Sequence, residues 1–265
     1  MKKIFSLLLV AVLMLVFVGC NGNSTPTNTD KPFTNELLTS NKIVIGTSPD
    51  YPPFESLDAS GNLVGFEIEL LEAVVAILNE QQGTNYTIEW KQMDFETIIG
   101  ALQAKQVDFG VSSFTWAADR DCIFTTPHLL SKQVVITRAD TGISQISDLV
   151  GKKIGAGGGT TGEQEAKKIE KATVLNIGDY GMMFQALQAG QLDAVVCDEA
   201  VGDNYVKTMG LVKLEETLLD ESVSVIIHND SPELAKVFNA AVEAYMATDA
   251  YSALLAKWDL AVVTE

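Results

Sequence analysis

The chain has 265 residues, of which 47% are apolar, 20% are charged and seven are prolines. This composition is typical of a globular protein, and the length allows one large domain or two domains of about 100 residues each. The excess of 35 acidic over 18 basic residues gives a net charge of −17, which argues against a nucleic-acid partner because phosphates are bound by clustered Lys and Arg. The three cysteines and two histidines match no disulfide scaffold or zinc motif, so we expect no metal and no cofactor.

The N-terminal segment has the pattern of an export signal. Lys2 and Lys3 precede an apolar run from Ile4 to Val18, which is shorter than the ~20 residues of a membrane span. Cys20 follows this run and Gly19 directly, which resembles a bacterial lipobox with a lipidated cysteine, although Phe17 is bulkier than the usual Leu. We expect a signal peptide over residues 1–19 and a flexible tether over the polar residues 20–32. The alternative is an uncleaved anchor with an incidental cysteine.

Strands alternate with helices in the residues that follow, which predicts βαβ units and an α/β fold. Residues 42–47 (KIVIGT) form a short β-branched run typical of a buried strand. Gly65 leads into a helix whose apolar positions fall on one broad face. The pattern then predicts a strand at 86–90, a helix at 95–104 and a strand at 107–112.

An internal repeat indicates two similar α/β lobes. Residues 101–108 (ALQAKQVD) and 186–193 (ALQAGQLD) share six of eight positions, and each copy joins the end of a helix to an apolar strand. Upstream of each copy lies a strand with an Ile-Gly pair, at 45–46 and at 154–155. Ligand sites in such folds lie beyond the carboxyl ends of the strands, so two facing lobes would enclose a cleft.

Polar residues that follow these strands are the candidate site. Ser112, Ser113, Thr115 and Arg120 come after the first repeat copy, and Asp198 comes after the second. A guanidinium suits a carboxylate and a carboxylate suits an ammonium, so this set fits a zwitterion, at ~1.5–3 kcal/mol for each charged hydrogen bond. The alternatives are that Arg120 forms a surface salt bridge and that Asp198 caps a helix.

Three further features border the predicted cleft. Residues 155–162 form a glycine-rich turn in which Thr160 or Thr161 would cap a helix whose free N–H groups favour anions. The same glycines satisfy a dinucleotide-binding pattern, but export from the cytoplasm argues against a nicotinamide cofactor. Tyr51 and Phe95 could flank an apolar or cationic side chain, or could simply pack in the core.

Several ordered motifs resemble one known family, the extracellular solute-binding proteins of ABC importers for polar amino acids (solute-binding family 3). The resemblance covers residues 42–260. It is carried by IGTSPDYPPFESLDASGNLVGFEIELLEAV, DFETIIGALQAKQVDFGVSSFT, LVGKKIGAGGGTTGE, LQAGQLDAVVCDEA and the terminal KWDL. The resemblance implies two lobes with central sheets joined by two hinge strands, the periplasmic-binding-protein-like type II fold. Lobe 1 would comprise 33–129 plus 225–265, lobe 2 would comprise 134–219, and the hinge strands would be 130–133 and 220–224.

The resemblance also implies roles for the candidate residues. Arg120 matches the arginine that binds the ligand α-carboxylate, and Asp198 matches the aspartate that binds the α-ammonium. The implied ligand-binding set is Ser48, Tyr51, Phe95, Ser112, Ser113, Thr115, Arg120, Thr160, Thr161 and Asp198. Two departures affect this set. The segment between Arg120 and Phe124 is two residues shorter than usual, and Ser48 stands where basic- and glutamine-binding relatives often have an acid. Glu55 could replace that charge, or it could be a solvated loop acid.

These features together predict a monomeric, lipid-anchored binding protein on the outer face of a bacterial membrane. It would capture a basic, glutamine-like or cystine-like amino acid and deliver it to an ABC permease. The rival hypothesis is a cyclohexadienyl-dehydratase-like enzyme on the same fold, with Glu55 or Glu199 as the cleft acid. Cys122 and Cys197 would lie on different lobes, so we expect both to be free thiols.

Overall fold

The computed structural model describes residue 38 and residues 40–260, all within one compact unit, Pro32–Glu265. The predicted signal peptide, Cys20 and the tether therefore lie outside the described residues. Within the described residues, no helix combines the length and the apolar character that crossing a bilayer requires.

Helices and strands alternate as the sequence predicts. The helices are α1 (Phe66–Gln82), α2 (Phe95–Gln103), α3 (Thr161–Lys167), α4 (Tyr180–Gln188), α5 (Glu199–Met209), α6 (Pro232–Met246) and α7 (Asp249–Lys257), with a 3-10 turn η1 (Ile146–Leu149). The strands are β1 (Lys42–Thr47), β2 (Asp50–Tyr51), β3 (Glu55–Leu57), β4 (Leu63–Val64), β5 (Thr87–Gln92), β6 (Phe109–Thr115), β7 (Ile123–Phe124), β8 (Leu129–Thr137), β9 (Lys153–Gly155), β10 (Thr173–Leu175), β11 (Ala194–Asp198) and β12 (Val212–Ile227).

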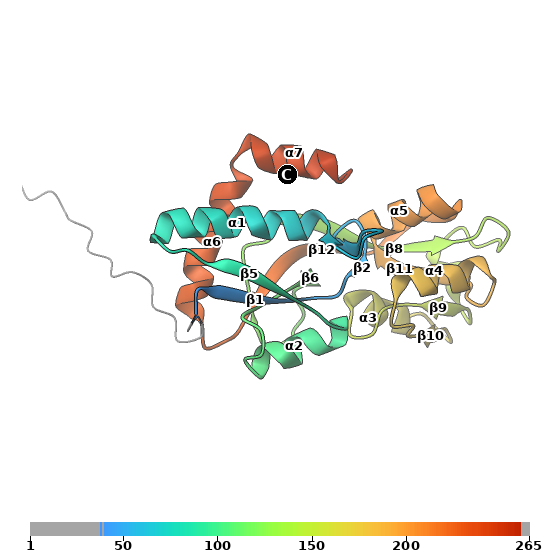
Figure 1. Cartoon of the computed structure of the whole chain (residues 1–265). Helices are drawn as coiled ribbons and strands as arrows, with labels where there is room; N and C mark the ends of the chain where they lie inside the picture. The colour runs from blue at the N-terminus through green and yellow to red at the C-terminus, as the bar shows by residue number, and fades with distance from the viewer. Residues whose placement is uncertain (1–37, 39, 261–265) are drawn as a thin grey trace, which may run out of the picture. The chain divides into compact units, whose positions relative to one another are not determined.

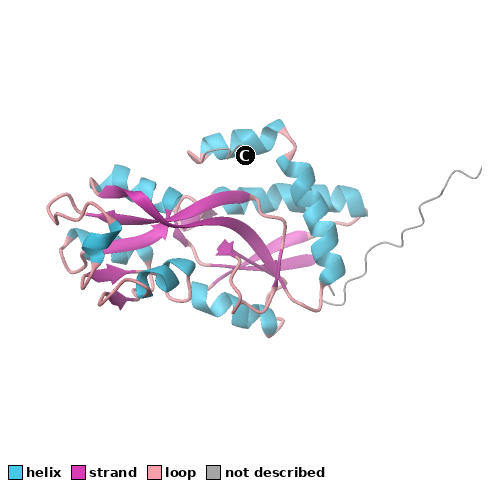
Figure 2. Cartoon of the chain, turned by 180° about the vertical axis from the view of Figure 1, so that it is seen from behind, coloured by secondary structure: helices cyan, strands magenta, loops and turns pink. Residues whose placement is uncertain are grey.

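One hydrogen-bonded sheet runs through both halves of the described fold. Its order is β10-β9-β11-β8-β12-β6-β1-β5, while β7 pairs with β12 and β2-β3-β4 form a separate small sheet. The parallel strands β1, β5 and β6 lie on one side of the long antiparallel pair β8–β12, and β9, β10 and β11 lie on the other (Figure 1). Helices cover both faces of the strands (Figure 2). The α/β, two-lobe fold predicted from the sequence is confirmed, and the two sets of strands join edge to edge through β8 and β12.

The predicted elements agree closely with the observed ones in the first half. The strand at 42–47 has the predicted bounds, and the second strand begins one residue later than expected and extends to Gln92. On α1 the predicted apolar face is buried, with Leu70, Leu71 and Val74 fully inside. Gly65 precedes this helix at φ 149°, where an added Cβ would lie 2.0 Å from the carbonyl oxygen of Phe54. Only glycine fits there, which explains the abrupt start of α1.

The repeat forms the same local structure in both halves. Asp108 donates its N–H to the carbonyl of Val44 at 2.7 Å, and its carboxylate accepts the N–H of Val44 at 2.8 Å. Asp193 makes the equivalent pair of bonds with Lys153, both at 2.8 Å. Each aspartate therefore aligns the strand that follows the repeat with the strand that carries the Ile-Gly pair. Because Asp108 bonds to Val44 in this way, β6 begins at the next residue, Phe109, which is two residues later than predicted.

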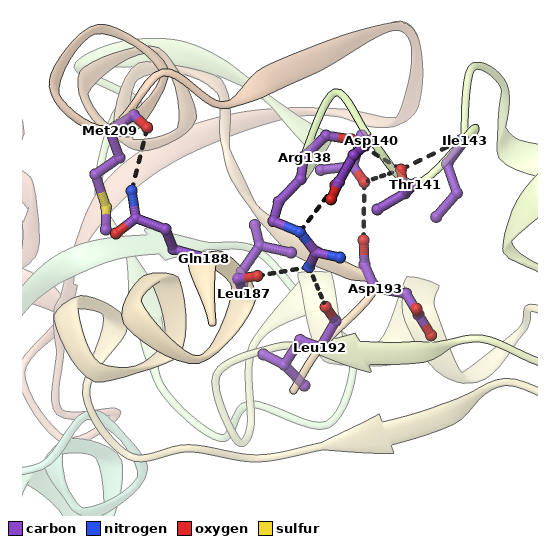
Figure 3. Close-up of polar contacts among 10 residues, drawn as sticks. Arg138, Asp140, Thr141, Ile143, Leu187, Gln188, Leu192, Asp193 and Met209 are labelled. Atoms are coloured by element: carbon purple, nitrogen blue, oxygen red, sulfur yellow. Dashed lines mark hydrogen bonds and ion pairs between the residues drawn. The ribbon is translucent and has the colours of Figure 1, made fainter. Parts of the chain in front are cut away.

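The two repeat copies differ in how their turns are held. The left-handed position is Lys105 at φ 56° in the first copy and Gly190 at φ 74° in the second. In the second copy Arg138 donates from Nη1 to the carbonyls of Leu187 (2.6 Å) and Leu192 (2.9 Å), on either side of this turn (Figure 3). Arg138 therefore stabilises the turn between α4 and β11.

We predict that Gly190→Ala lowers the free energy of unfolding by about 1 kcal/mol, because a side chain in the left-handed region is strained. Gly100 is the matched control, since it lies inside α2 and an added Cβ there would meet no atom within 4 Å. Gly100→Ala should raise the free energy of unfolding by about 0.5–1 kcal/mol. Urea denaturation of both variants measures these values, and equal effects would contradict the interpretation.

Candidate functional site

A cavity of about 200 Å³ lies where the strands of the two halves end. Its walls come from the ends of β1, β6 and β11 and from the segments that begin α2, α3, α4 and α5. The residues that line it are Ser48, Asp50, Tyr51, Asp94, Phe95, Glu96, Ser112, Ser113, Thr115, Arg120, Gln133, Gly157, Gly158, Thr160, Thr161, Asn176, Ile177, Gly178, Tyr180 and Asp198.

All ten residues of the predicted ligand-binding set line this one cavity. They come from positions 48 to 198, so the fold gathers residues that are far apart in the chain. Their role in binding stays a prediction. The sequence analysis missed several neighbours on the same walls, namely Asp50, Asp94, Glu96, Gln133, Asn176 and Tyr180. Asp94 and Tyr180 stand at the starts of α2 and α4, so the rule that sites lie past strand ends could have found them.

Arg120 enters the cavity from the loop after β6. Its guanidinium carbon lies 5.5 Å and 5.3 Å from the ring centroids of Phe95 and Phe114, which stack on each other. Its nitrogens donate to the carbonyl of Thr115 and, at 3.0 Å, to the carbonyl of Gly159 in the opposite wall. Among the described residues no carboxylate forms an ion pair with Arg120, so the alternative of a surface salt bridge is wrong. Burial lowers the pKa of Arg120, but a guanidinium remains charged.

The end of β6 presents hydroxyl groups to the same cavity. The side-chain oxygens of Ser113 and Thr115 are buried and have no hydrogen-bond partner within the described part of the chain. A buried polar group without a partner costs about 1–3 kcal/mol. A ligand that bonded to these hydroxyls would recover that cost.

A buried acid fixes the backbone of Ser113. This residue has a left-handed φ of 49°, and its N–H donates to Oε2 of Glu67 at 2.6 Å. Oε1 of Glu67 lies 2.9 Å from Nε2 of His128, and both side chains are fully buried. The contact between Glu67 and His128 therefore lies behind the cavity wall and supports the conformation in which Ser113 faces the cavity.

Asp198 lies at the end of β11 and is 4% exposed. It occupies the position before α5, but its side chain makes no capping hydrogen bond, so the helix-cap alternative is wrong for this side chain. Its carboxylate accepts from the hydroxyl of Tyr51 (2.6 Å), from Ser131 Oγ (2.6 Å) and from Gln133 Nε2 (3.3 Å). Burial, followed by the charge of Glu221, raises the pKa of Asp198 to about 8.

The aromatic residues have double roles. The hydroxyl of Tyr51 also accepts the N–H of Asp198 at 2.8 Å, and its ring lies 4.5 Å from that of Tyr180. Phe95 lines the cavity while its ring stacks on Phe114, with 4.7 Å between centroids. Both residues therefore pack against neighbours and still contribute to the cavity wall.

Asp50 supplies an acid beside Ser48. Ser48 donates to Oδ1 of Asp50 at 2.7 Å, and Oδ2 of Asp50 accepts the N–H of Tyr180 at 3.2 Å. Asp50 lines the cavity, and burial raises its pKa. An acidic group therefore stands two residues after the serine that replaces the acid of the family pattern.

Glu55 does not replace that charge at the cavity wall. It is fully buried and is absent from the cavity lining, so it is not a solvated loop acid either. Its Oε1 accepts from Ser112 Oγ at 3.0 Å, and burial together with the charge of Glu67 raises its pKa. The strand β3 turns this side chain inward, which the spacing alone does not reveal. Glu199 also lies off the cavity lining and pairs with Lys213 at 2.8 Å.

The glycine-rich turn opens α3 as predicted. Thr160 is the cap, because its Oγ1 accepts the N–H of Glu163 at 3.0 Å while donating to the carbonyl of Gly157 at 2.7 Å. The hydroxyl of Thr161 donates to Oε2 of Glu221 at 2.8 Å. Both hydroxyls are thus engaged inside the protein.

The expectation for the cysteines is confirmed, because Cys122 and Cys197 are both free. Cys197 is buried in β11, and burial raises the pKa of Cys122 to about 11. The described residues contain no group of three or more His, Cys, Asp or Glu side chains that could hold a metal ion.

Comparison with known proteins identifies the family. Residues 43–261 match the model of the bacterial extracellular solute-binding proteins, family 3, and the chain belongs to that family. It is similar to the arginine-binding extracellular protein ArtP of Bacillus subtilis (27% identity, 97% of this chain and 98% of the relative). It is also similar to the L-cystine-binding protein TcyJ of Escherichia coli K12 (26% identity, 97% and 96% of the two chains).

Solved structures give the same result. The fold matches the structure of an ancestral arginine-binding protein bound to arginine with a TM-score of 0.77 and 31% identity, covering 83% of this chain and 98% of that one. It matches the structure of an ancestral arginine-binding protein bound to glutamine with a TM-score of 0.75 and 32% identity, covering 83% and 98% of the two chains. The relatives are named as binding proteins, which points away from an enzyme.

We predict that Glu67→Ala lowers the free energy of unfolding by about 3–5 kcal/mol, because it leaves His128 and the N–H of Ser113 without their buried partner. Glu67→Gln keeps an oxygen for Ser113 and should lose less than half of that value. Urea denaturation measures both variants. Equal losses would show that the negative charge of Glu67, rather than the hydrogen bond to Ser113, carries the effect.

Proposed function

We propose that this protein is the extracytoplasmic binding component of an ABC importer for a polar L-amino acid, and that it holds the amino acid in the described cavity. One observation carries the proposal: Arg120 and Asp198 enter a single cavity from opposite halves of the sheet without pairing with each other. The relatives named for arginine, histidine, cystine and glutamine support an amino acid as the ligand class.

Arg120 would bind the α-carboxylate. A guanidinium presents a planar set of donors that matches a carboxylate bidentately, and Arg120 has no acidic partner among the described residues. The unpartnered hydroxyls of Ser113 and Thr115 would complete the hydrogen bonds to the ligand. Asp198 would bind the α-ammonium, since it is the carboxylate at the end of β11 and lines the opposite wall.

The acidic residues of the lining favour a ligand whose own side chain is cationic. Asp50, Asp94 and Glu96 line the cavity in addition to Asp198, whereas Arg120 is the basic residue of the lining. The aromatic faces of Tyr51 and Phe95 would flank the ligand and add a cation–π contribution. We therefore rank a basic amino acid above a glutamine-like or cystine-like one.

Ligand binding would couple the two lobes. We assign lobe 1 to 33–129 plus 225–265, lobe 2 to 134–219, and the hinge to 130–133 and 220–224. The hinge segments fall within β8 and β12, which pair side by side and carry the chain between the halves. A ligand that contacts both lobes favours the closed state, and closure excludes water and strengthens the charged contacts. A membrane permease would then bind the closed form of the monomer.

Membrane attachment completes the proposal. The signal-peptide pattern of residues 1–19 and the position of Cys20 support export and lipidation on the outer face of the membrane. Metabolic labelling with a fatty-acid analogue tests this, with Cys20→Ala as the control that should lose the label.

We predict that Arg120→Ala and Asp198→Ala each weaken amino-acid binding by about 2–5 kcal/mol, because each leaves a buried ligand charge without its partner. Isothermal titration calorimetry measures the change. Arg138→Ala is the control for loss of a partly buried arginine, since Arg138 contacts Leu187 and Leu192 away from the cavity lining. It should lower stability and leave the affinity of the folded protein unchanged. Normal binding by both site variants would refute the proposed site.

Mass spectrometry of the ligand carried through purification, followed by titration with the twenty amino acids, identifies the bound side chain.

The enzyme hypothesis is tested by incubating the protein with prephenate and arogenate. We expect no sustained product, because Glu55 and Glu199, the two acids considered for that role, do not line the cavity. Sustained turnover would overturn the assignment as a binding protein.

A further inference from the structure

The hydroxyl of Tyr51 makes two hydrogen bonds to one residue on the opposite wall of the cavity. It donates to Oδ2 of Asp198 at 2.6 Å and accepts the N–H of Asp198 at 2.8 Å. Tyr51 is 9% exposed and Asp198 is 4% exposed, so little water competes for these bonds. A ring that only flanks a ligand needs no hydroxyl, so the two bonds point to a separate role for this group.

Tyr51 and Asp198 come from opposite sides of the β8–β12 pair. Tyr51 lies on β2, which follows β1, whereas Asp198 ends β11. The rest of β2 contacts the same side as Asp198. Asp50 accepts the N–H of Tyr180 at 3.2 Å, and the rings of Tyr51 and Tyr180 lie 4.5 Å apart. β2 is therefore a segment of lobe 1 that packs directly against lobe 2.

The other donors to Asp198 belong to a strand beside it. Ser131 and Gln133 lie on β8 and donate to Oδ1 at 2.6 Å and to Oδ2 at 3.3 Å, respectively. Gln133 is also the register partner of Asp198 in the antiparallel pair of β8 and β11. These donors would stay beside Asp198 if the lobes moved apart. The hydroxyl of Tyr51 would leave, because Tyr51 belongs to the other lobe.

The three donors restrict how Asp198 can bind a further group. An ionised carboxylate offers about four acceptor positions. Tyr51 and Gln133 both donate to Oδ2, and Ser131 donates to Oδ1. With Tyr51 in place, the acceptor position that remains lies on Oδ1. The hydroxyl of Tyr51 thereby fixes which oxygen of Asp198 receives a donor from a ligand.

We propose that the hydroxyl of Tyr51 is a positioning group for Asp198, and that on lobe closure it fixes the carboxylate so that Oδ1 receives an N–H of the ligand ammonium. The ammonium site is then complete only in the closed state, because each lobe contributes a part of it. The inference rests on the proposed function, since it requires that Asp198 bind an ammonium group. It separates the role of the Tyr51 hydroxyl from that of the ring, which flanks the ligand.

Tyr51→Phe removes the hydroxyl and keeps the ring, so it tests the inference directly on the full-length protein. The dissociation constant for L-arginine should rise about tenfold to a hundredfold, the factor expected for one hydrogen bond to a charged group. The rise should appear in the dissociation rate, because the contact forms after the ligand has entered the cavity. Isothermal titration calorimetry and stopped-flow fluorescence measure the two quantities. An unchanged dissociation constant would overturn the inference.

A ligand without the ammonium group separates positioning from packing. The probe is δ-guanidinovalerate, which is L-arginine without its α-amino group, titrated at millimolar concentration. Wild-type protein and Tyr51→Phe should bind it with nearly equal affinity, because neither can use the ammonium site. Equal weakening of both ligands would show that the hydroxyl supports the cavity as a whole, and the inference would fail.

A double-mutant cycle with Asp198→Asn gives a second comparison with L-arginine. Tyr51→Phe should weaken binding much less in the Asp198→Asn background than in the wild-type protein, because the hydroxyl acts through the carboxylate. Additive effects of the two substitutions would contradict a positioning role.

Tyr251→Phe is the matched control for the loss of a tyrosine hydroxyl. The buried hydroxyl of Tyr251 donates to the carbonyl of His128, and Tyr251 lies away from the cavity lining. This variant should lower the free energy of unfolding and keep the affinity of the folded protein for L-arginine. A loss of affinity as large as that of Tyr51→Phe would show that the effect is not specific to the contact with Asp198.

The two proposals fail in different ways. L-Glutamine and L-cystine, which carry the same α-ammonium group, replace L-arginine as probes if the latter does not bind, each with its own analogue that lacks the α-amino group. Failure of the wild-type protein to bind all three would refute the proposed function. Binding by the wild-type protein with unchanged affinity in Tyr51→Phe would refute this inference alone.

Discussion

The proposed site depends on a guanidinium and a carboxyl group, those of Arg120 and Asp198, which the fold places in one cavity without pairing them. Arg120 is held by carbonyl groups and aromatic rings, and Asp198 is held by hydroxyl and amide donors. Buried charges without a mutual partner are costly, so the surrounding structure must compensate them. A small molecule with a carboxylate and an ammonium would complete both sets of contacts, which is the basis of the proposed amino-acid site.

Neighbouring side chains hold the groups on the two sides of the cavity in place. Glu67 and His128 fix the backbone of Ser113 on the side of Arg120, while Gln133 and Glu221 surround Asp198 on the other side. The supporting groups of Asp198 lie on β8 and β12, the same strands that connect the halves. Groups that contact Asp198 thus occupy the strands proposed to bend on closure.

Predictions from the local sequence were correct where a residue type favours one kind of local structure. The strand at 42–47 follows from its β-branched run, and the helix start at Thr160 or Thr161 follows from capping chemistry; both act within a short stretch of chain. The structure then selected Thr160 as the cap. Glu55 was assigned wrongly because the direction of its side chain depends on how β3 packs. Gln133 was missed because it follows no strand end; it lies in the middle of β8 and still lines the cavity.

The sequence alone determined the α/β class, the duplicated plan and the set of polar residues past the strand ends, because hydrophobic periodicity and the repeat are local properties of the chain. Only the tertiary structure decided which of these residues share a cavity and which acids stand beside them. Asp50 and Asp198 differ from the solvated acids of this very acidic chain only in their burial and partners, and both depend on segments that lie far apart in the sequence.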